Sequence, residues 1–384
     1  MSIEFSRVLD QIPPSGIRKF FDLVIGSKDI ISLGVGEPDF VTPWGIREEA
    51  IATLEQGATS YTANAGLLEC REEIVRYLKE RFNLSYNAKT ETMLTVGVSE
   101  GVDITMRALL NPGDEVIIPE PGYVCYHPLV TLAGGVPITL DTSANHFIPD
   151  PKELEKIITP RTKALVLCSP NNPTGVVIPK ETLEAIAALS KKYKFWVITD
   201  EIYAELNYEG YTSYASLPDV KDRTVLLSGF SKAFAMTGWR LGYICGPEAL
   251  VSRTLKIHQY SALCAPIIAQ YAAIEALKHN LKAVEEMRKS YLLRRNFFVK
   301  KLNEAGLPTP MPSGAFYTFS SIKHTGLSSE EFALNLLKKE RVAVVPGNAF
   351  GVCAEGYIRC CYATDMDQLK EAVLRIKRFI KGLK

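Results

Sequence analysis

Three short apolar runs, each followed at once by polar residues, constrain the fold of this 384-residue chain more than any other feature. The runs are residues 164–168, 195–199 and 224–227. Uninterrupted apolar runs of this length are typical of strands buried on both faces of a parallel sheet. Ligands of open α/β sheets bind beyond the carboxyl ends of such strands. The loops that follow the three runs are therefore predicted to meet at one site.

The loops carry an amide, a carboxylate, a phenol and an amine, from Asn172, Asp200, Tyr203 and Lys232. These groups match the needs of pyridoxal 5'-phosphate. A lysine amine attaches an aldehyde as a Schiff base, and a buried carboxylate keeps a pyridine nitrogen protonated. A phenol and a carboxamide donate hydrogen bonds that keep the ring oxygen ionised. Lys232 and Asp200 are predicted to fill the first two roles, and Tyr203 and Asn172 the last.

The phosphate of such a cofactor requires a cation and free backbone N–H groups. Arg240, eight residues after Lys232, can supply the cation. The turn 97–101 can supply the N–H groups at the start of a helix for which Ser99 is the predicted N-cap. The predicted phosphate-binding residues are Val98, Ser99, Glu100, Ser231 and Arg240.

These residues carry a resemblance to a known family. The sequence resembles the class I aminotransferases of fold type I, in the aspartate and aromatic aminotransferase branch, and the likeness runs from 31–39 through 61–66 to 357–359. The resemblance implies a pyridoxal-phosphate enzyme that moves an amino group from an L-amino acid to a 2-oxo acid such as 2-oxoglutarate. It also implies that the Lys232 amine moves the proton between the substrate's alpha carbon and the cofactor.

The resemblance implies roles for four further residues. Tyr123 matches an aromatic residue that stacks on the cofactor ring, and Arg359 matches an arginine that grips the substrate's alpha-carboxylate. Gly36 matches a glycine close to that carboxylate, so Gly36, Asn172 and Arg359 are the implied substrate-binding residues. Tyr61 matches a tyrosine that reaches the phosphate in the neighbouring subunit. A homodimer with shared active sites is therefore implied.

Two positions depart from the family pattern. Gly229 stands where some members carry a serine, so Ser231 and Arg240 are expected to hold more of the phosphate. Ser99, with Glu100 beside it, stands where aspartate-specific members carry a lysine that reads a second carboxylate. An aromatic, aliphatic or longer amino donor is therefore favoured over aspartate.

Several of these residues also have structural explanations. Asp200 is a suitable N-cap for a helix over 202–206, and Arg240 can lie beside Trp239. Arg359 can pair with Glu355 or Asp365.

Two other functions remain open on the same residues. A pyridoxal-phosphate lyase that eliminates a beta substituent needs the same cofactor contacts, and release of ammonia and pyruvate would identify it. A non-catalytic pyridoxal-phosphate-binding regulator usually carries an added DNA-binding domain, for which we expect no room in the short N-terminal segment.

Composition excludes several other classes. The 44 basic and 43 acidic residues give no electrostatic argument for binding nucleic acid or an anionic membrane surface. No apolar run of about 20 residues predicts a membrane-spanning helix, so a cytoplasmic protein is expected. The eight cysteines and five histidines lack the spacing of a disulfide framework or a metal site.

The order of the predicted elements indicates an α/β fold, with a mostly parallel sheet flanked by helices and a smaller α+β domain. Residues 45–275 are the predicted cofactor-binding domain. Residues 276–384, completed by an N-terminal arm over 1–44, are the predicted small domain. Helices are expected at 67–82, 267–278, 282–305, 328–340 and 366–382, and later strands at 315–320, 342–345 and 356–361.

Overall fold

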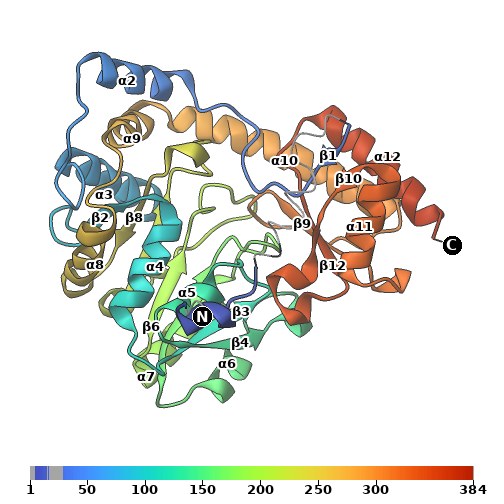
Figure 1. Cartoon of the computed structure of the whole chain (residues 1–384), viewed down its shortest axis with the longest axis horizontal. Helices are drawn as coiled ribbons and strands as arrows, with labels where there is room; N and C mark the ends of the chain where they lie inside the picture. Colours follow the sequence, from blue (N-terminus) through green and yellow to red (C-terminus); the bar gives the residue numbers. More distant parts are fainter. Residues whose placement is uncertain (1–4, 15, 17–28, 384) are drawn as a thin grey trace.

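A seven-stranded sheet with helices on both faces forms the larger part of the computed structural model, which describes residues 5–14, 16 and 29–383 (Figure 1). The strand order is β2-β8-β7-β6-β5-β3-β4, and only β8 runs against the others. The mostly parallel sheet is thereby confirmed. The strands are β2 (Thr92–Thr95), β3 (Glu115–Glu120), β4 (Val136–Asp141), β5 (Thr162–Cys168), β6 (Trp196–Asp200), β7 (Thr224–Gly229) and β8 (Gly242–Cys245).

The apolar runs form the central strands because both of their faces are covered. Along β5, Ala164 and Val166 join one apolar cluster, while Leu165 and Leu167 join another. The first cluster contains residues of α4 and α8, and the second contains residues of α6 and α7. The helices of this part are α2 (Trp44–Glu55), α3 (Leu68–Phe82), α4 (Gly97–Leu109), α5 (Tyr126–Leu132), α6 (Pro151–Ile157), α7 (Lys180–Tyr193), α8 (Glu248–Ser261) and α9 (Ile267–His279).

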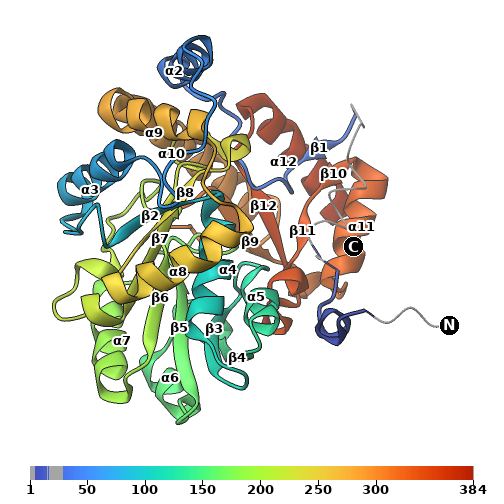
Figure 2. The same cartoon turned by 60° about the vertical axis from the view of Figure 1, so that its left-hand side comes forward.

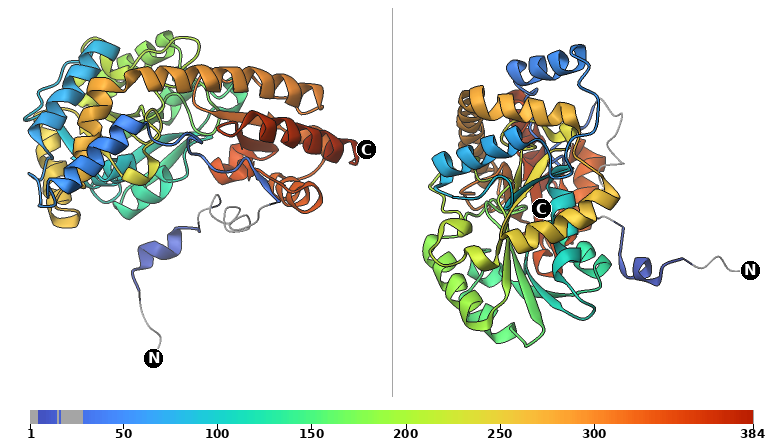
Figure 3. Two further views of the ribbon diagram at one scale, coloured as in Figure 1. Left: turned by 90° about the horizontal axis from the view of Figure 1, so that it is seen from above. Right: turned by 90° about the vertical axis from the view of Figure 1, so that its left-hand side faces the viewer.

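A second, antiparallel sheet lies beside the first and has the order β11-β12-β9 (Figure 2). Its strands are β9 (Tyr317–Ser321), β11 (Val345–Pro346) and β12 (Tyr357–Cys361). Three helices accompany it: α10 (Leu281–Glu304), α11 (Ser329–Glu340) and α12 (Met366–Lys381). The long helix α10 extends from the first part of the molecule to the second (Figure 3).

The segment 342–345 does not form the single strand that was predicted. Val342 and Ala343 form β10, which pairs in parallel with β1 (Ile31–Ser32). Val345 and Pro346 form β11 and pair with β12 instead. The chain changes partner at Val344, so four consecutive apolar residues serve two sheets. The expected helices are present, with ends that differ by at most about two residues.

Short 3-10 helices fill the connections. They are η1 (Arg7–Gln11), η2 (Ser143–Asn145), η3 (Tyr214–Ser216), η4 (Lys221–Arg223), η5 (Thr237–Trp239), η6 (Lys323–Thr325), η7 (Gly347–Phe350) and η8 (Val352–Ala354). Of the predicted N-terminal arm, residues 1–4, 15 and 17–28 lie outside the described residues. Within the described part, no helix has the length and apolar character needed to cross a membrane.

One apolar core joins the two sheets. Ile31 and Leu33 from the N-terminal segment, Tyr203 from the loop after β6, and Phe316 and Ile358 from the second sheet pack in the same cluster. The carboxyl end of β6 therefore faces the second sheet across a short distance. The functional side chains predicted from both halves of the sequence can meet there.

Candidate active site

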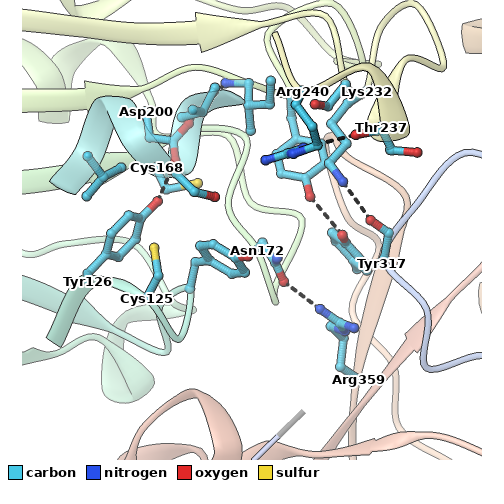
Figure 4. A pocket seen from close by; sticks show the side chains of 18 residues that line it. Cys125, Tyr126, Cys168, Asn172, Asp200, Lys232, Thr237, Arg240, Tyr317 and Arg359 are labelled. Carbon is cyan, nitrogen blue, oxygen red and sulfur yellow. Dashed lines mark hydrogen bonds between the residues drawn. The ribbon is translucent and has the colours of Figure 1, made fainter. Parts of the chain in front are cut away.

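A cavity of about 280 Å³ lies where the ends of β5, β6 and β7 face the second sheet (Figure 4). Its lining contains eleven of the thirteen residues predicted from sequence. These are Gly36, Val98, Ser99, Tyr123, Asn172, Asp200, Tyr203, Ser231, Lys232, Arg240 and Arg359. Tyr61 and Glu100 are not among the lining residues.

Lys232 lies in the turn after β7, and its amine enters the cavity. Its neighbours Phe230 and Phe234 are buried and pack together at a centroid distance of 5.5 Å, which anchors the turn. The Lys232 Nζ donates a hydrogen bond of 2.7 Å to the carbonyl oxygen of Gly36. Burial disfavours the charged ammonium and lowers the pKa of Lys232 to about 8. The amine is therefore neutral in far more molecules near pH 8 than an ordinary lysine would be, and only the neutral amine can act as a nucleophile or base.

Asp200 ends β6 and is buried beneath the cavity. Its Oδ2 accepts a hydrogen bond of 2.8 Å from the Tyr126 hydroxyl, and its Oδ1 accepts one of 3.2 Å from the Ile202 N–H. Burial raises the pKa of Asp200 to about 6, although the bond from Tyr126 acts in the opposite direction. The segment after Asp200 forms turns, so the alternative role as a helix N-cap does not apply. A cation in the cavity would favour the ionised carboxylate.

The turn 97–101, called the phosphate turn because it is predicted to bind a phosphate, begins α4 and contacts the Arg240 guanidinium. Gly97 has a φ of +74°, and a Cβ at this position would collide with Nη2 of Arg240. Helix α4 starts at Gly97 with Val96 as its N-cap, so the prediction that Ser99 is the N-cap is wrong. The Glu100 carboxylate accepts the N–H of Val96, and the helix starts three residues earlier than predicted. Ser99 thus lies in the first turn, beside the cavity.

Glu100 points away from the cavity. Its Oε1 lies 2.8 Å from Nδ1 of His258, a histidine of α8 that is 0 % exposed. Its Oε2 accepts the Val96 N–H. The Glu100 side chain therefore supports the phosphate turn from the side of α8.

Gly229 has no room for a side chain. A Cβ there would lie 2.8 Å from the Cα of Gly242 and 2.9 Å from the carbonyl oxygen of Leu241. Gly229 pairs with Gly242 between β7 and β8, and a Cβ on Gly242 would lie 2.7 Å from the N atom of Val98. This pair of glycines lets the phosphate turn lie directly against the sheet. The departure from the family pattern at Gly229 thus has a steric cause.

Arg359 is buried and has no carboxylate partner among the residues that the structure describes. It is 2 % exposed, its Nη1 donates 2.9 Å to Oδ1 of Asn172, and its Nη2 donates 2.6 Å to the carbonyl oxygen of Gly34. Its Nε is buried without a hydrogen-bond partner. Neither Glu355 nor Asp365, the alternative partners, bonds to it; they accept backbone N–H groups at the starts of α11 and α12. A buried guanidinium without an anion is costly, so the site is suited to a bound carboxylate.

The alternative in which Arg240 only lies beside Trp239 does not account for its contacts. Its Nη1 donates 2.9 Å to the carbonyl oxygen of Thr237, and its guanidinium lies over Gly97 and not only beside Trp239.

Two tyrosines at the cavity were missed from sequence. Tyr126 begins α5, and its hydroxyl donates to Oδ2 of Asp200. Tyr123 precedes the helix, so its spacing from Tyr126 gives no periodic signal for this contact. Tyr317 begins β9, and its hydroxyl lies 2.7 Å from that of Tyr203. Nothing in the sequence around Tyr317 marks it out. The other lining residues not predicted are Val102, Cys125, Cys168, Ile202 and Thr237.

Tyr61 lies on a different surface. It is 81 % exposed, on a loop that Asn64 ties to the end of α8 through a 2.8 Å bond to the carbonyl oxygen of Leu263. Tyr260, near the end of α8, is likewise 88 % exposed. Both of these large aromatic side chains are thus exposed to solvent.

The comparisons with known proteins agree with this geometry. The sequence model of the family "Aminotransferase class I and II" matches residues 28–376. The chain is 57 % identical to the putative aminotransferase YugH of Bacillus subtilis, over 99 % of both chains. It is 46 % identical to an aspartate aminotransferase of Pyrococcus abyssi, over 98 % of both chains.

A solved structure gives the same result. The aromatic aminotransferase from Pyrococcus horikoshii superposes with a TM-score of 0.91 at 45 % identity, covering 95 % of this chain and 99 % of that one. The fold-type I architecture expected from the resemblance is confirmed. The chain therefore belongs to the class I and II aminotransferases, enzymes that transfer amino groups.

Proposed function

We propose that this aminotransferase binds pyridoxal 5'-phosphate at the cavity, with Lys232 as the attachment residue, and accepts aromatic, aliphatic or longer amino donors in preference to aspartate. A 2-oxo acid such as 2-oxoglutarate is the proposed acceptor. The observation that carries the proposal is the desolvated Lys232 amine, which faces the cavity lined by Asp200, Tyr203 and Arg359.

The residues present fit this cofactor in three respects. The Lys232 amine is deprotonated at a pH where an ordinary lysine is charged. The Arg240 guanidinium and the first turn of α4 form a cradle for a phosphate, and a side chain at Gly97 would fill part of it. The unpartnered Nε of Arg359 leaves a buried donor for the substrate carboxylate.

The family's cofactor supplies an electron sink that stabilises negative charge at the substrate's alpha carbon. In this chain, Arg359 and Asn172 would orient the substrate carboxylate. The neutral Lys232 amine would take the proton from the alpha carbon, and in the reverse direction the protonated amine would give it back to that carbon. Asp200 would favour a protonated ring nitrogen by charge attraction, and Tyr203 and Asn172 would donate to the ring oxygen. Tyr123 is proposed to cover the ring, and Ser231 joins the phosphate contacts.

The preference against aspartate follows from the cations at the cavity. Among the described residues that line it, the cations are Lys232, Arg240 and Arg359. The proposal assigns these to the cofactor aldehyde, the phosphate and the alpha-carboxylate, so the described lining residues leave no cation for a second carboxylate. Relatives of this chain carry both aspartate and aromatic names, so the family alone does not choose the donor.

We also propose a homodimer in which Tyr61 reaches the phosphate of the neighbouring subunit. The exposure of Tyr61 and Tyr260 supports a contact on that face. The division into a large domain over 45–275 and a small domain formed by 1–44 and 276–384 is proposed because the seven-stranded sheet lies within the first range. The cytoplasmic location stays a prediction.

An amino-donor panel tests the function directly. Each amino acid, including free and acetylated diaminopimelate, is added to the purified holoenzyme without any 2-oxo acid, and the visible absorbance is recorded. Conversion of the cofactor to its amine form by aromatic, aliphatic or longer donors, with little conversion by aspartate, is the expected result. Lys232→Ala is the control and should show no conversion.

Two results would contradict this proposal. Faster conversion by aspartate than by the other donors would overturn the donor preference. Release of ammonia and pyruvate without conversion of the cofactor would identify the lyase.

A further inference from the structure

Tyr317 contacts three separate parts of the active site. It comes from the second sheet, and its hydroxyl lies 2.7 Å from that of Tyr203, on the loop after β6 (Figure 4). Its ring lies under the Arg359 guanidinium, 4.5 Å from the ring centre. A Cβ at Gly36 would lie 2.5 Å from the same hydroxyl, and the carbonyl oxygen of Gly36 accepts the bond from Lys232.

The hydroxyls of Tyr203 and Tyr317 carry one proton each, and a single hydrogen bond joins the two groups. Burial raises the pKa of both phenols well above the ordinary value, so both keep their protons at neutral pH. One hydroxyl donates within the pair, and the hydroxyl that accepts keeps its own proton free to donate elsewhere. The direction of this one bond therefore decides which tyrosine donates into the cavity.

The surroundings favour Tyr317 as the donor within the pair. A guanidinium over a phenol ring attracts its electron density and makes the hydroxyl a stronger donor. Arg359 lies over Tyr317 in this way. The ring of Tyr203 instead meets the rings of Phe316 and Tyr317 edge to face, at 5.5 and 5.8 Å. Tyr203 is thus the better acceptor, and its own proton remains available.

We propose that Tyr317 is a positioning residue, whose hydroxyl donates to Tyr203 and thereby directs the Tyr203 O–H at the ring oxygen of the bound cofactor. The inference rests on the proposed function, because it requires that Tyr203 donate to that oxygen. Hydrogen bonds in series strengthen one another, so Tyr317 also makes Tyr203 a better donor. The stack with Arg359 links this donor to the residue that holds the substrate carboxylate.

The test uses the pH dependence of the visible absorbance of the holoenzyme. A donor to the ring oxygen favours the form of the cofactor with more negative charge on that oxygen, which is the deprotonated form. Loss of the donor therefore raises the pKa of the spectral transition. We expect Tyr203→Phe to raise it, and Tyr317→Phe to raise it by about 0.5 to 1 unit, the size expected for one hydrogen bond.

The decisive comparison is the double variant. If Tyr317 acts only through Tyr203, adding Tyr317→Phe to Tyr203→Phe should produce no further shift. Tyr362→Phe is the matched control, because Tyr362 is buried in the same core and its hydroxyl bonds 3.1 Å to the carbonyl oxygen of Ala315. It should leave the transition unchanged, although it also removes a buried hydroxyl.

The outcomes separate this inference from the proposed function. No shift in Tyr317→Phe, or a shift that adds fully to that of Tyr203→Phe, overturns the role of Tyr317 and leaves Tyr203 in place. No shift in Tyr203→Phe, with the cofactor still attached to Lys232, overturns the proposed role of Tyr203 and the inference with it. An unmodified protein that shows no visible band at all overturns the proposed function.

A second variant covers the case in which Tyr317→Phe fails to fold or to hold the cofactor. Placing 3-fluorotyrosine at position 317 keeps the hydroxyl and makes it more acidic, so it becomes a stronger donor. The pKa of the spectral transition should then fall. A rise or no change would contradict the proposed direction of the bond.

Discussion

Among single residues, the site depends on two ionisable groups, Lys232 and Asp200. Burial brings the pKa of each closer to neutral pH. Lys232 and Asp200 are displaced in opposite directions, to about 8 and about 6, because burial disfavours the charged form of each. The aldehyde of a bound cofactor would meet the neutral form of the Lys232 amine. A positive charge on the cofactor ring would favour the ionised form of the Asp200 carboxylate.

The Lys232 amine should react in the apoprotein with a pH midpoint near 8. The neutral amine is the reactive form, so labelling by an acylating reagent should rise as pH increases from 6 to 9, with its half-maximum at about 8. An ordinary exposed lysine has a pKa of about 10.4, so its labelling should rise later. Mass spectrometry of the peptide that contains Lys232 gives the midpoint, and a value near 10 would contradict the desolvated site.

Asp200→Asn should lower the turnover rate by about a hundredfold to a thousandfold, because an amide cannot attract the proton on the ring nitrogen. Steady-state turnover at saturating substrate measures the loss. Glu201→Gln is the matched control, since Glu201 is the next residue and equally buried, and its carboxylate accepts bonds from Thr199 and Ser213. A rate close to normal in Asp200→Asn would remove Asp200 from the mechanism.

At the level of elements, the pairing of β7 with β8 and the start of α4 together build the cradle proposed for the phosphate. Gly229 and Gly242 face one another across the two strands, and the turn at Gly97 and Val98 lies over them. The contact is between backbones, so it leaves no space for a side chain to be added.

Gly229→Ser should therefore weaken the enzyme, even though some family members carry a serine at this place. The new Cβ would push β7 from β8, and we expect a loss of about 1 to 3 kcal/mol in the free energy of unfolding, with weaker cofactor binding. Gly238→Ser is the control, because no atom lies within 4 Å of a Cβ there. Thermal denaturation of both apoproteins tests the difference, and a Gly229→Ser protein as stable as Gly238→Ser would show that the strands adjust.

At the scale of the whole molecule, residues distant in sequence close the site. The N-terminal segment provides the carbonyl oxygens of Gly34 and Gly36 to Arg359 and Lys232. Leu33 of the same segment donates its N–H to Ala343 of β10, and its carbonyl oxygen accepts from Cys361 of the second sheet. Movement of the second sheet relative to the first would thus be transmitted to both cationic side chains.

Shared active sites can be tested by mixing two inactive proteins. If Tyr61 serves the neighbouring subunit, a heterodimer of Tyr61→Ala and Lys232→Ala has one intact site and one doubly damaged site. An equal mixture that has exchanged subunits should recover roughly one quarter of normal activity, since about half of the dimers are mixed and each has one working site of two.

The controls are each variant carried alone through the same unfolding and refolding, with the dimer verified by size-exclusion chromatography. Absence of recovery would place Tyr61 in its own subunit's site or outside any site. A fully active Tyr61→Ala protein would exclude a phosphate contact altogether.

The fold class, the mostly parallel sheet and the side chains at the ends of its strands are predictable from the amino-acid sequence alone. These properties are local: a buried strand is read from consecutive apolar residues, and the loop after it follows directly in the chain. Asn172, Asp200, Tyr203 and Lys232 were found in this way, and the structure brings all four to one cavity.

The contacts among the remaining groups depend on how the elements pack in three dimensions. The hydroxyls of Tyr203 and Tyr317 are separated by 114 positions, and no periodicity within one element reports such a contact. The orientation of Glu100 toward His258 and the division of 342–345 between two sheets have the same origin. Spacing along the chain specifies neighbours within a helix or strand, whereas packing between elements selects which of many similar side chains face one another.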